Sequence, residues 1–369
     1  MAQLVLATLD AGGNVPPVLT IGRDLQSSGH GVHVIGHPAQ RDQVEVAGLA
    51  FTPYTHARPW SPTAEKSTLG GLRDFVGVFN DRGAGGDVVD LARRVRADAV
   101  GIDCMLLGVL AAVQAAQVPS AALFHTFHAY FDGPWRRGPV GLLSRLHGHH
   151  ARRLWAGVDL GLVLTEAGLD PASPGAEAAL VWTGAVVDTE APALETPRPR
   201  VLVSLSTTAF PGMATTLQRI LDALADLPVE AVVTTGPAID PASLRAASNT
   251  AVHRVVDHAE LMPTCSLVVS HGGHATSLRA LAHGLPLLVI PAHPMLDQTM
   301  VGEAVARAGA GTVLPRSSSP DRIRDAVTRL LDTPSYRTAA ASLGTQIRAG
   351  QGSRTAANAL LGLVERAPH

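Results

Sequence analysis

The segment 268–286 carries a histidine, glycines and hydroxyl side chains at a spacing that suits an anion-binding turn. It reads as a short apolar strand, a turn made of His271, Gly272 and Gly273, and a helix that carries Thr276. The glycines let the backbone approach a ligand closely, and the helix start supplies unpaired N–H groups at the positive end of its dipole. The imidazole and hydroxyl groups add donors, so the pattern predicts a site that holds a diphosphate without a metal. The alternative is a turn that needs glycines only for its own backbone.

A second polar turn follows, and the order of the two turns carries a resemblance. The His-Gly-Gly-x-x-Thr turn, the helix end 280–286 and the polar turn 291–298 succeed one another, and the stretch 304–314 continues the pattern. Together they resemble the nucleotide-sugar signature of the family 1 glycosyltransferases, which have the two-domain GT-B fold. Weaker similarity covers nearly the whole chain, and the pattern is similar to that of actinobacterial antibiotic and other natural-product glycosyltransferases.

By motif position, the resemblance implies donor contacts in the second half of the chain. Residues 271–276 and Thr207 would hold the diphosphate, and residues 256–258 would flank the base. Asp297 and Gln298 would hydrogen-bond the sugar hydroxyls. Preorganised donors of this kind stabilise the negative charge that develops as a nucleoside diphosphate departs. The donor-binding set implied in this way is Thr207, Val256, His258, His271, Gly272, Gly273, His274, Ala275, Thr276, Asp297 and Gln298.

Arg279 is the first departure from the family pattern. Members that use ribonucleotide donors usually carry a glutamate at this position, where it accepts hydrogen bonds from the ribose hydroxyls. Since a deoxyribose lacks the 2′-OH, the change favours a dTDP-activated sugar over a UDP sugar. The alternative is that Arg279 is a solvated helix residue without influence on the donor. No cofactor is expected apart from this nucleotide-sugar co-substrate.

Asn14 is the second departure. The N-terminal turn of the family usually carries a histidine that removes the acceptor's proton, helped by an aspartate at the end of a later strand. Here Asn14 stands at the histidine position, whereas Asp103 matches the helper. A neutral amide cannot act as a general base, and the loss of general-base help costs about 10² to 10⁴ in rate.

Three interpretations of the general base stay open. In the first, Asp103 acts directly with Asn14 orienting it or the acceptor, since a carboxylate beside apolar residues can have its pKa raised into a useful range. In the second, another side chain supplies the base, and the candidates are Asp10 on the same turn and the histidines His125 and His128. In the third, the acceptor is an amine, an acidic phenol or a carbon nucleophile that needs little help.

Histidine clusters raise the question of a metal. The chain has 16 histidines, and His147, His149 and His150 form the densest cluster. No acidic residue is adjacent, and Arg145 and Arg152 bring positive charge that disfavours a bound cation. We therefore expect a solvated helix face at this cluster and no metal requirement.

Short apolar strands, each followed by a turn and a helical stretch, must position the candidate residues. This alternation recurs in both halves of the chain and predicts an α/β protein with parallel, doubly wound sheets. The strands are expected near residues 4–8, 33–36, 99–102, 121–124, 200–205, 230–234, 266–270 and 285–290. Two Rossmann-like domains of this kind are expected to face each other across a cleft, with the site at the carboxyl ends of both sheets.

A Pro-rich stretch divides the chain. It predicts two domains, over 1–185 and over 200–350, joined by a linker over 186–199. The resemblance implies that the first domain binds the acceptor and the second the nucleotide sugar. The segment 351–369 is expected to form a helix that packs back on the N-terminal domain, as in GT-B relatives.

Composition excludes several classes of protein. The chain has 369 residues, of which 46% are hydrophobic and 16% charged, with a formal net charge of -2, so nucleic acid and anionic membranes are poor partners. Its longest apolar stretch is broken by Gln114, Gln117 and Pro119, which argues against a membrane span. Two cysteines and a start without a basic leader favour the cytoplasm. Oligomeric state is left open.

The resemblance, together with these exclusions, implies an inverting glycosyltransferase. It would move a sugar, favoured to be a deoxysugar from a dTDP donor, onto a small lipophilic acceptor such as an aromatic or polyketide aglycone. Two alternatives stay open: a sugar-nucleotide epimerase of the same fold, and a catalytically degenerate sugar-nucleotide-binding partner protein.

Overall fold

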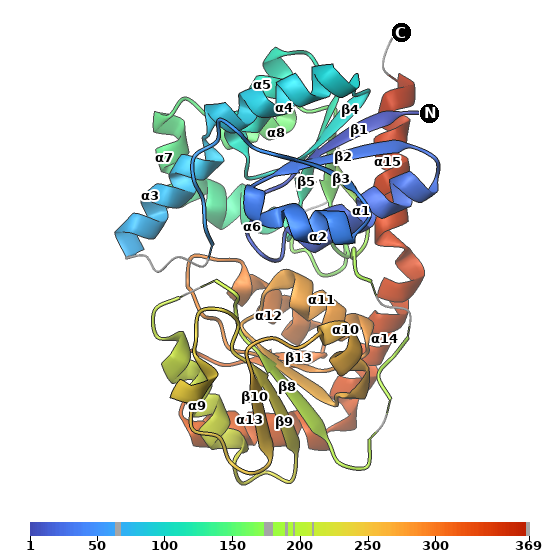
Figure 1. Cartoon of the computed structure of the whole chain (residues 1–369). Helices are drawn as coiled ribbons and strands as arrows, with labels where there is room; N and C mark the ends of the chain where they lie inside the picture. Colours follow the sequence, from blue (N-terminus) through green and yellow to red (C-terminus); the bar gives the residue numbers. More distant parts are fainter. Residues whose placement is uncertain (63–67, 173–179, 189–190, 195, 209, 367–369) are drawn as a thin grey trace. The chain divides into compact units, whose positions relative to one another are not determined.

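A computed structural model describes residues 1–62, 68–172, 180–188, 191–194, 196–208 and 210–366 of the chain (Figure 1). The chain divides into two compact units, Met1–Val186 with the segment from Gln351 onward, and Val187–Gly350. Residues 189, 190 and 195 of the predicted linker, and residues 367–369 of the predicted C-terminal segment, lie outside the described residues. Each unit is built around its own parallel sheet.

The sheet of the first unit has the strand order β3-β2-β1-β4-β5-β6-β7, and its described strands all pair in parallel. Its inner strands are mostly apolar, and β4 and β5 are buried along their whole length, as expected for strands covered on both faces. The strands are β1 (Gln3–Ala7), β2 (Gly31–Gly36), β3 (Ala50–Pro53), β4 (Ala99–Asp103), β5 (Ser120–Phe124), β6 (Leu160–Val163) and β7 (Leu180–Trp182).

Helices cover both faces of this sheet. α1 begins just after the turn that follows β1, has prolines in its first turn, and is followed at Gly29 by the left-handed backbone conformation that glycine favours. The C-terminal helix α15 packs against α1 and contributes apolar side chains to the same core. The helices are α1 (Val15–Ser27), α2 (Arg41–Val46), α3 (Thr68–Phe79), α4 (Arg82–Val95), α5 (Leu107–Ala115), α6 (His128–Tyr130), α7 (Pro139–Leu146), α8 (Ala151–Ala156) and α15 (Gly352–Arg366).

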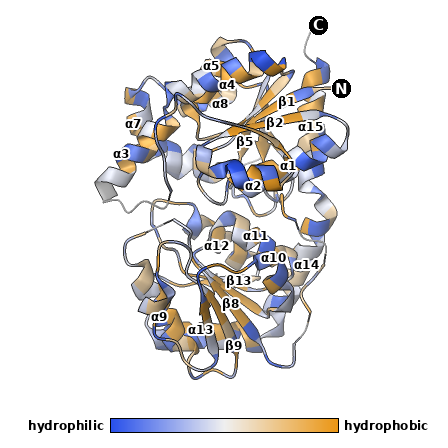
Figure 2. Cartoon of the chain, in the orientation of Figure 1, coloured by the Kyte–Doolittle hydropathy of each residue, from blue (hydrophilic) through white to orange (hydrophobic). Residues whose placement is uncertain are grey.

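The sheet of the second unit has the order β10-β9-β8-β11-β12-β13, again with parallel pairing throughout its described strands. Its strands are β8 (Arg200–Ser204), β9 (Glu230–Thr234), β10 (Thr250–His253), β11 (Leu267–Ser270), β12 (Leu287–Val289) and β13 (Gly311–Val313). Its helices are α9 (Met213–Leu224), α10 (His258–Leu261), α11 (His274–Ala282), α12 (Gln298–Arg307), α13 (Pro320–Asp332) and α14 (Pro334–Gly350). Central strands such as β1, β8 and β9 are coloured mainly as hydrophobic in Figure 2. The predicted fold of two parallel-sheet α/β domains is confirmed.

Each sheet reverses its strand order at one point. In the first unit the reversal lies between β1 and β4, and in the second between β8 and β11. In doubly wound sheets, ligands bind outside the carboxyl ends of the strands at such a switch point, where the two flanking loops diverge. Asn14 and Asp103 follow or end the strands at the first switch point, and Thr207 and His271 follow the strands at the second.

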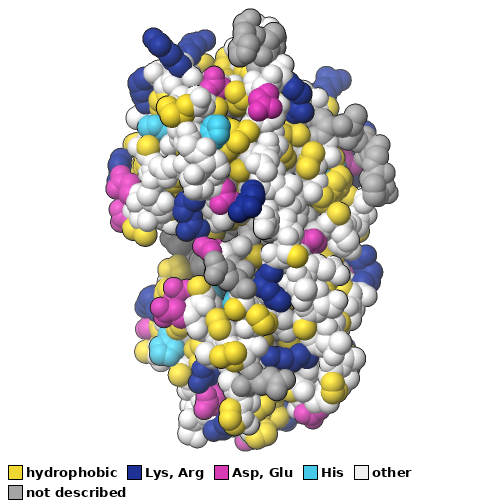
Figure 3. Space-filling model, turned by 90° about the vertical axis from the view of Figure 1, so that its right-hand side faces the viewer, with side chains coloured by type: hydrophobic (Ala, Val, Ile, Leu, Met, Phe, Trp, Pro, Cys, Tyr) yellow, Lys and Arg dark blue, Asp and Glu magenta, His cyan; other side chains and the backbone are white. Residues whose placement is uncertain are grey.

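On the face drawn in Figure 3, basic and acidic side chains are interspersed among uncharged ones. Among the helices that the structure describes, none has both the length and the apolar character needed to cross a bilayer.

Candidate active site

In the first unit, Asn14 and Asp103 are joined by a buried hydrogen bond. Asn14 lies in the turn after β1 and its Nδ2 donates to Oδ2 of Asp103 at 2.7 Å. The other carboxylate oxygen of Asp103, Oδ1, accepts from the backbone N–H of Met105 at 2.9 Å. Asp103 is only 2% exposed, so its carboxylate is fixed by donors from two sides and largely covered.

His125 approaches the same carboxylate from the next strand. It directly follows β5, and its Nδ1 lies 3.6 Å from Oδ2 of Asp103. The ring stands edge-on to Phe131, with 5.2 Å between ring centroids, and its side chain is 15% exposed. Nδ1 itself is buried and has no hydrogen-bond partner among the described residues, so the exposed part of the ring lies away from it. The structure thus brings Asn14, Asp103 and His125 together.

The two other candidate bases lie in different surroundings. His128 is buried at the start of α6, its backbone N–H donates to Asp170, and its ring packs against Phe124 at 5.1 Å. Asp10 is half-buried, and burial raises the pKa of its carboxyl group. In the described part of the chain, no hydrogen bond or ion pair joins either residue to Asp103.

Metal binding fits this cluster poorly. Asp103, Cys104 and His125 place one ligand-type atom each within 4.8 Å of one another. Burial raises the pKa of the Cys104 thiol well above its usual range, whereas a metal ligand must be a thiolate. Both oxygens of Asp103 already accept hydrogen bonds. The donor set is therefore better suited to proton transfer than to holding a cation.

The histidine cluster near residue 149 is not the solvated helix face that the sequence indicates. Residues 147–150 connect α7 to α8, and His149 is buried. Its Nδ1 makes a 2.9 Å hydrogen bond with Oδ1 of Asn80, a residue 69 positions away. That prediction was wrong for His149, because the partner that buries it comes from a distant part of the chain.

In the second unit, close packing in the turn after β11 accounts for the two glycines of that turn. Gly272 has a φ of +84°, and a Cβ at this position would lie 2.5 Å from the carbonyl oxygen of Gln298. A Cβ on Gly273 would lie 2.6 Å from the ring of His271. Gly273 is the N-cap of α11 and supplies no capping side chain. The turn therefore packs closely and presents the His271 ring beside the start of a helix, as a phosphate site requires.

The His271 ring is neutral in this site. Burial lowers the pKa of its imidazole to about 4, and its Nδ1 has no hydrogen-bond partner among the described residues. The hydroxyl of Ser277, in the first turn of α11, is likewise buried without a partner in the described part of the chain. Buried polar atoms without a partner are costly, and a ligand that paired with them would offset that cost.

The polar turn before α12 is held by its own glutamine. Gln298 is 2% exposed, and its Oε1 accepts from the backbone N–H groups of Ala292 at 2.8 Å and His293 at 2.9 Å. The amide oxygen therefore shapes the turn, which leaves the NH₂ group to donate to a ligand. Asp297 is half-buried at the N-cap of α12.

The remaining donor candidates lie on neighbouring loops of the same unit. Thr207 is exposed in the turn after β8, while Val256 and His258 are half-buried at the start of α10. Arg279 is half-buried with its Nε covered and unpaired among the described residues. Burial is the main cause of the lowered pKa of His258, and the positive charge of Arg279 is the second cause. Arg279 therefore lies near the segment expected to flank the base. Arg279 is thus only partly exposed, with its Nε on the covered side.

Two supporting residues escaped the sequence analysis. The Oγ of Ser270 accepts from the N–H of Gly272 at 3.1 Å, and Phe131 supports the His125 ring. A polar residue that ends an apolar strand directly before the glycines was a usable signal for Ser270. No signal pointed to Phe131, whose contact depends on how the chain folds after β5.

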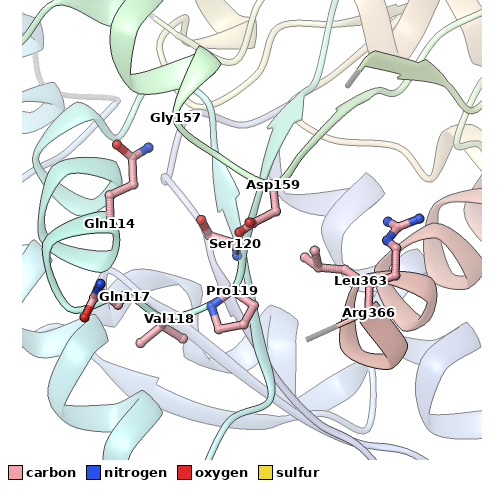
Figure 4. A pocket seen from close by; sticks show the side chains of 9 residues that line it. All are labelled: Gln114, Gln117, Val118, Pro119, Ser120, Gly157, Asp159, Leu363 and Arg366. Carbon is pink, nitrogen blue, oxygen red and sulfur yellow. Dashed lines mark hydrogen bonds between the residues drawn. The ribbon is translucent and has the colours of Figure 1, made fainter. Parts of the chain in front are cut away.

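A separate pocket of about 520 Å³ lies at the amino ends of β5 and β6 in the first sheet (Figure 4). It is bordered by Ser120, the first residue of β5, and by Asp159, Gln114 and Arg366. His125 follows the last residue of the same strand, so this pocket is apart from the candidate site.

Part of the chain matches known proteins by sequence. Residues 218–358 match the family of C-terminal domains described as erythromycin biosynthesis protein CIII-like. The 10-deoxymethynolide desosaminyltransferase of Streptomyces venezuelae is 37% identical over 152 residues, which are 39% of this chain and 34% of that protein. The chain spans about a third of the length of the curated relatives it matches.

Solved structures match the fold over the whole chain. A calicheamicin glycosyltransferase superposes with a TM-score of 0.79 at 22% identity and covers 100% of both chains. The glycosyltransferase VinC, solved in complex with dTDP, gives 0.74 at 21% identity over 99% of this chain and 100% of that chain. The predicted GT-B fold is confirmed, and so is the resemblance to the natural-product glycosyltransferases.

Proposed function

The second unit carries an EryCIII-like domain and the chain has the GT-B fold, and from this premise we propose that the protein is an inverting glycosyltransferase. It transfers a sugar, preferentially a deoxysugar from a dTDP donor, to a small lipophilic natural-product acceptor. The relative that transfers a desosaminyl group, by its name, and the neighbour solved with dTDP support this choice of substrates.

One observation carries the proposal. The His271-Gly272-Gly273 turn lies at the switch point of the second sheet, beside the start of α11, with unpaired buried polar atoms in the described residues around it. Helix N–H groups and a neutral imidazole donor are suited to two linked phosphates. They stabilise the diphosphate as it leaves, and no metal is expected to be needed.

The reaction is a direct displacement at the anomeric carbon. The acceptor nucleophile attacks from one side of the sugar while the bond to the diphosphate breaks on the other, which inverts the configuration. Asp297 and the amide NH₂ of Gln298 are the groups we assign to the sugar hydroxyls. Orientation of this kind lowers the barrier because the reacting atoms need not be brought together at the moment of reaction.

Calorimetric titration with dTDP, without added metal, tests the donor site. We expect dTDP to bind, and His271→Ala to weaken binding at least about tenfold through loss of a phosphate donor. His253, an exposed histidine on β10, supplies the matched control His253→Ala, which should bind dTDP as the unchanged protein does. If dTDP and UDP both fail to bind, the His271-Gly272-Gly273 turn does not bind a diphosphate and the proposal fails.

Arg279 supports the choice of dTDP. It holds the position at which relatives that bind ribonucleotides accept hydrogen bonds from the ribose, and a guanidinium has no acceptor to offer a 2′-OH. We expect Arg279→Glu to move the preference from dTDP toward UDP by about tenfold, or about 1.4 kcal/mol, measured as the ratio of the two dissociation constants. Arg279→Met, which removes the charge without adding a carboxylate or amide acceptor, is the control; an unchanged ratio in Arg279→Glu would reject this role.

Aromatic side chains of the first unit support a lipophilic acceptor. Trp60 donates from Nε1 to the carbonyl oxygen of Asp10 at 2.5 Å, which holds it beside the turn that follows β1. Its ring packs against Phe75 at 5.2 Å, and both residues are half-buried.

Turnover of the donor alone, with epimerised sugar as the product, would instead indicate the epimerase. Binding of dTDP without turnover of any acceptor would indicate a degenerate binding protein.

A further inference from the structure

The order of the strands lets one carboxylate serve two different loops. β4 lies between β1 and β5 in the sheet, so Asp103 at the end of β4 adjoins the loop after each neighbour. On the β1 side it accepts a hydrogen bond from Asn14 at 2.7 Å, and on the β5 side it faces the ring of His125 at 3.6 Å. An imidazole supplied from either loop can therefore be oriented by the same aspartate.

Asp103 and His125 differ in how much of each side chain is exposed. The Asp103 side chain is 3% exposed and both of its oxygens accept hydrogen bonds, so a bulky acceptor cannot easily reach it. The His125 side chain is 15% exposed, and its buried atom is Nδ1, which faces Asp103. Because Nδ1 is buried and faces Asp103, Nε2 on the other side of the ring is the nitrogen left for a substrate.

We infer that His125 is the general base of the transfer, oriented by Asp103, and that Asn14 is a positioning residue that fixes Asp103. The inference rests on the proposed glycosyl transfer. Nε2 takes the hydroxyl proton of the acceptor as the acceptor oxygen forms its bond to the anomeric carbon. The bond from that carbon to the diphosphate oxygen breaks, and its electron pair leaves with the diphosphate.

The geometry supplies what this step needs. A neutral imidazole can accept at Nε2 only if its proton is on Nδ1, and Asp103 is the acceptor that Nδ1 faces. The 3.6 Å separation is long for a hydrogen bond, and a small rotation of the ring closes it; catalytic hydrogen bonds commonly tighten when substrate binds. After proton transfer, the carboxylate stabilises the imidazolium.

Moving the histidine back to the β1 loop gives a direct test. His125→Gln should lower kcat for an alcohol acceptor by about 10² to 10⁴ while dTDP binding stays unchanged. The double variant Asn14→His/His125→Gln should recover at least tenfold over His125→Gln. His150→Gln, at an exposed histidine, is the matched control. Full activity of His125→Gln, or no recovery in the double variant, overturns the inference.

A series of phenol acceptors of graded acidity separates a base from a merely structural residue. A base matters less as the acceptor ionises more readily, so the loss in His125→Gln should shrink from the least to the most acidic phenol. An equal loss across the series would indicate a structural role and reject the inference.

A spectroscopic measurement keeps this test independent of turnover. In the ¹⁵N spectrum of the whole protein, neutral His125 should carry its proton on Nδ1, and Asp103→Asn should shift the tautomer toward Nε2–H. A neutral His125 that carries its proton on Nε2 in the unchanged protein would contradict the inference. Failure of the proposed function itself would be recognised separately, by the absence of dTDP binding.

Discussion

At the scale of single residues, burial and partners decide which of several chemically suitable side chains can act. Asp103, Asp10, His125 and His128 are all plausible bases by residue type. His128 is buried by ring contacts, and Asp103 is covered and bonded on both oxygens. His125 combines a carboxylate neighbour with an exposed ring edge, and no pattern in the sequence could supply that combination.

His37 allows the effect of burial on protonation to be measured. The residue follows β2, is 3% exposed, and has no hydrogen-bond partner for either ring nitrogen among the described residues. Burial lowers the pKa of its imidazole from 6.5 to about 4. As pH falls, the unfolded chain binds the proton first, so this contribution to stability is complete above about pH 6.5 and is lost toward pH 4. The loss amounts to at most about 3 kcal/mol.

We expect His37→Phe to flatten this dependence. Urea unfolding at about pH 7 and about pH 5 should show a smaller loss of stability in the variant, since a phenyl ring has no proton to bind. His253→Phe, at an exposed histidine, should follow the unchanged protein. Parallel losses in His37→Phe and the unchanged protein would mean that His37 is not the source.

At the scale of elements, apolar patterning predicted the eight strands expected above, because a buried parallel strand needs a continuous apolar run. The shorter or less buried strands β3, β6, β7, β10 and β13 were not predicted by this patterning. The helix after β1 ends near Gly29 as predicted, since glycine adopts the left-handed conformation that closes a helix. The order of strands in the sheet was not readable in the same way. It places Asp103 between two loops, and the pairing with His125 depends on it. The burial of His149 by Asn80 was hidden for the same reason.

The turn after β11 makes a testable element. Gly273→Ala would put a Cβ 2.6 Å from the His271 ring and displace that ring from the start of α11. We expect dTDP binding to weaken about tenfold with little change in stability, because the backbone at Gly273 is extended and tolerates a side chain. Calorimetry and thermal unfolding measure the two effects.

Gly86→Ala is the matched control for this substitution. A Cβ at Gly86 has no atom within 4 Å, and the residue lies exposed in α4. This variant should gain about 0.5 to 1 kcal/mol through its better helix propensity and bind dTDP normally. Unchanged dTDP binding in Gly273→Ala would show that the ring position does not matter.

At the scale of the whole molecule, the chain builds one unit from two separate segments. The segment from Gln351 onward returns to the first unit after the second unit is complete. Its helix α15 packs on α1, and Leu360 is fully buried in the core that β1, β2 and α1 share. The donor site proposed here lies entirely in the other unit. Stability and donor binding are therefore expected to respond to different substitutions.

Leu360→Ala tests this division. Truncation of a fully buried leucine leaves a cavity and costs about 2 to 5 kcal/mol, and the cost should fall on the first unit alone. We expect scanning calorimetry to show a lowered transition for that unit and an unchanged one for the second. A dTDP concentration of about 100 times the dissociation constant should raise the free energy of unfolding of the second unit by about 2.7 kcal/mol. Only the second transition should therefore move to a higher temperature.

Asn358→Ala provides the control on the same helix, because Asn358 is exposed and its truncation leaves no cavity. Its first transition should not fall, since alanine favours the helix slightly more than asparagine, and its second should stay where it is in the unchanged protein. If dTDP instead restored the transition lowered by Leu360→Ala, binding in the second unit would be coupled to the core of the first. The two units would then fold as one cooperative body, and a substitution in either would have to be judged by its effect on both.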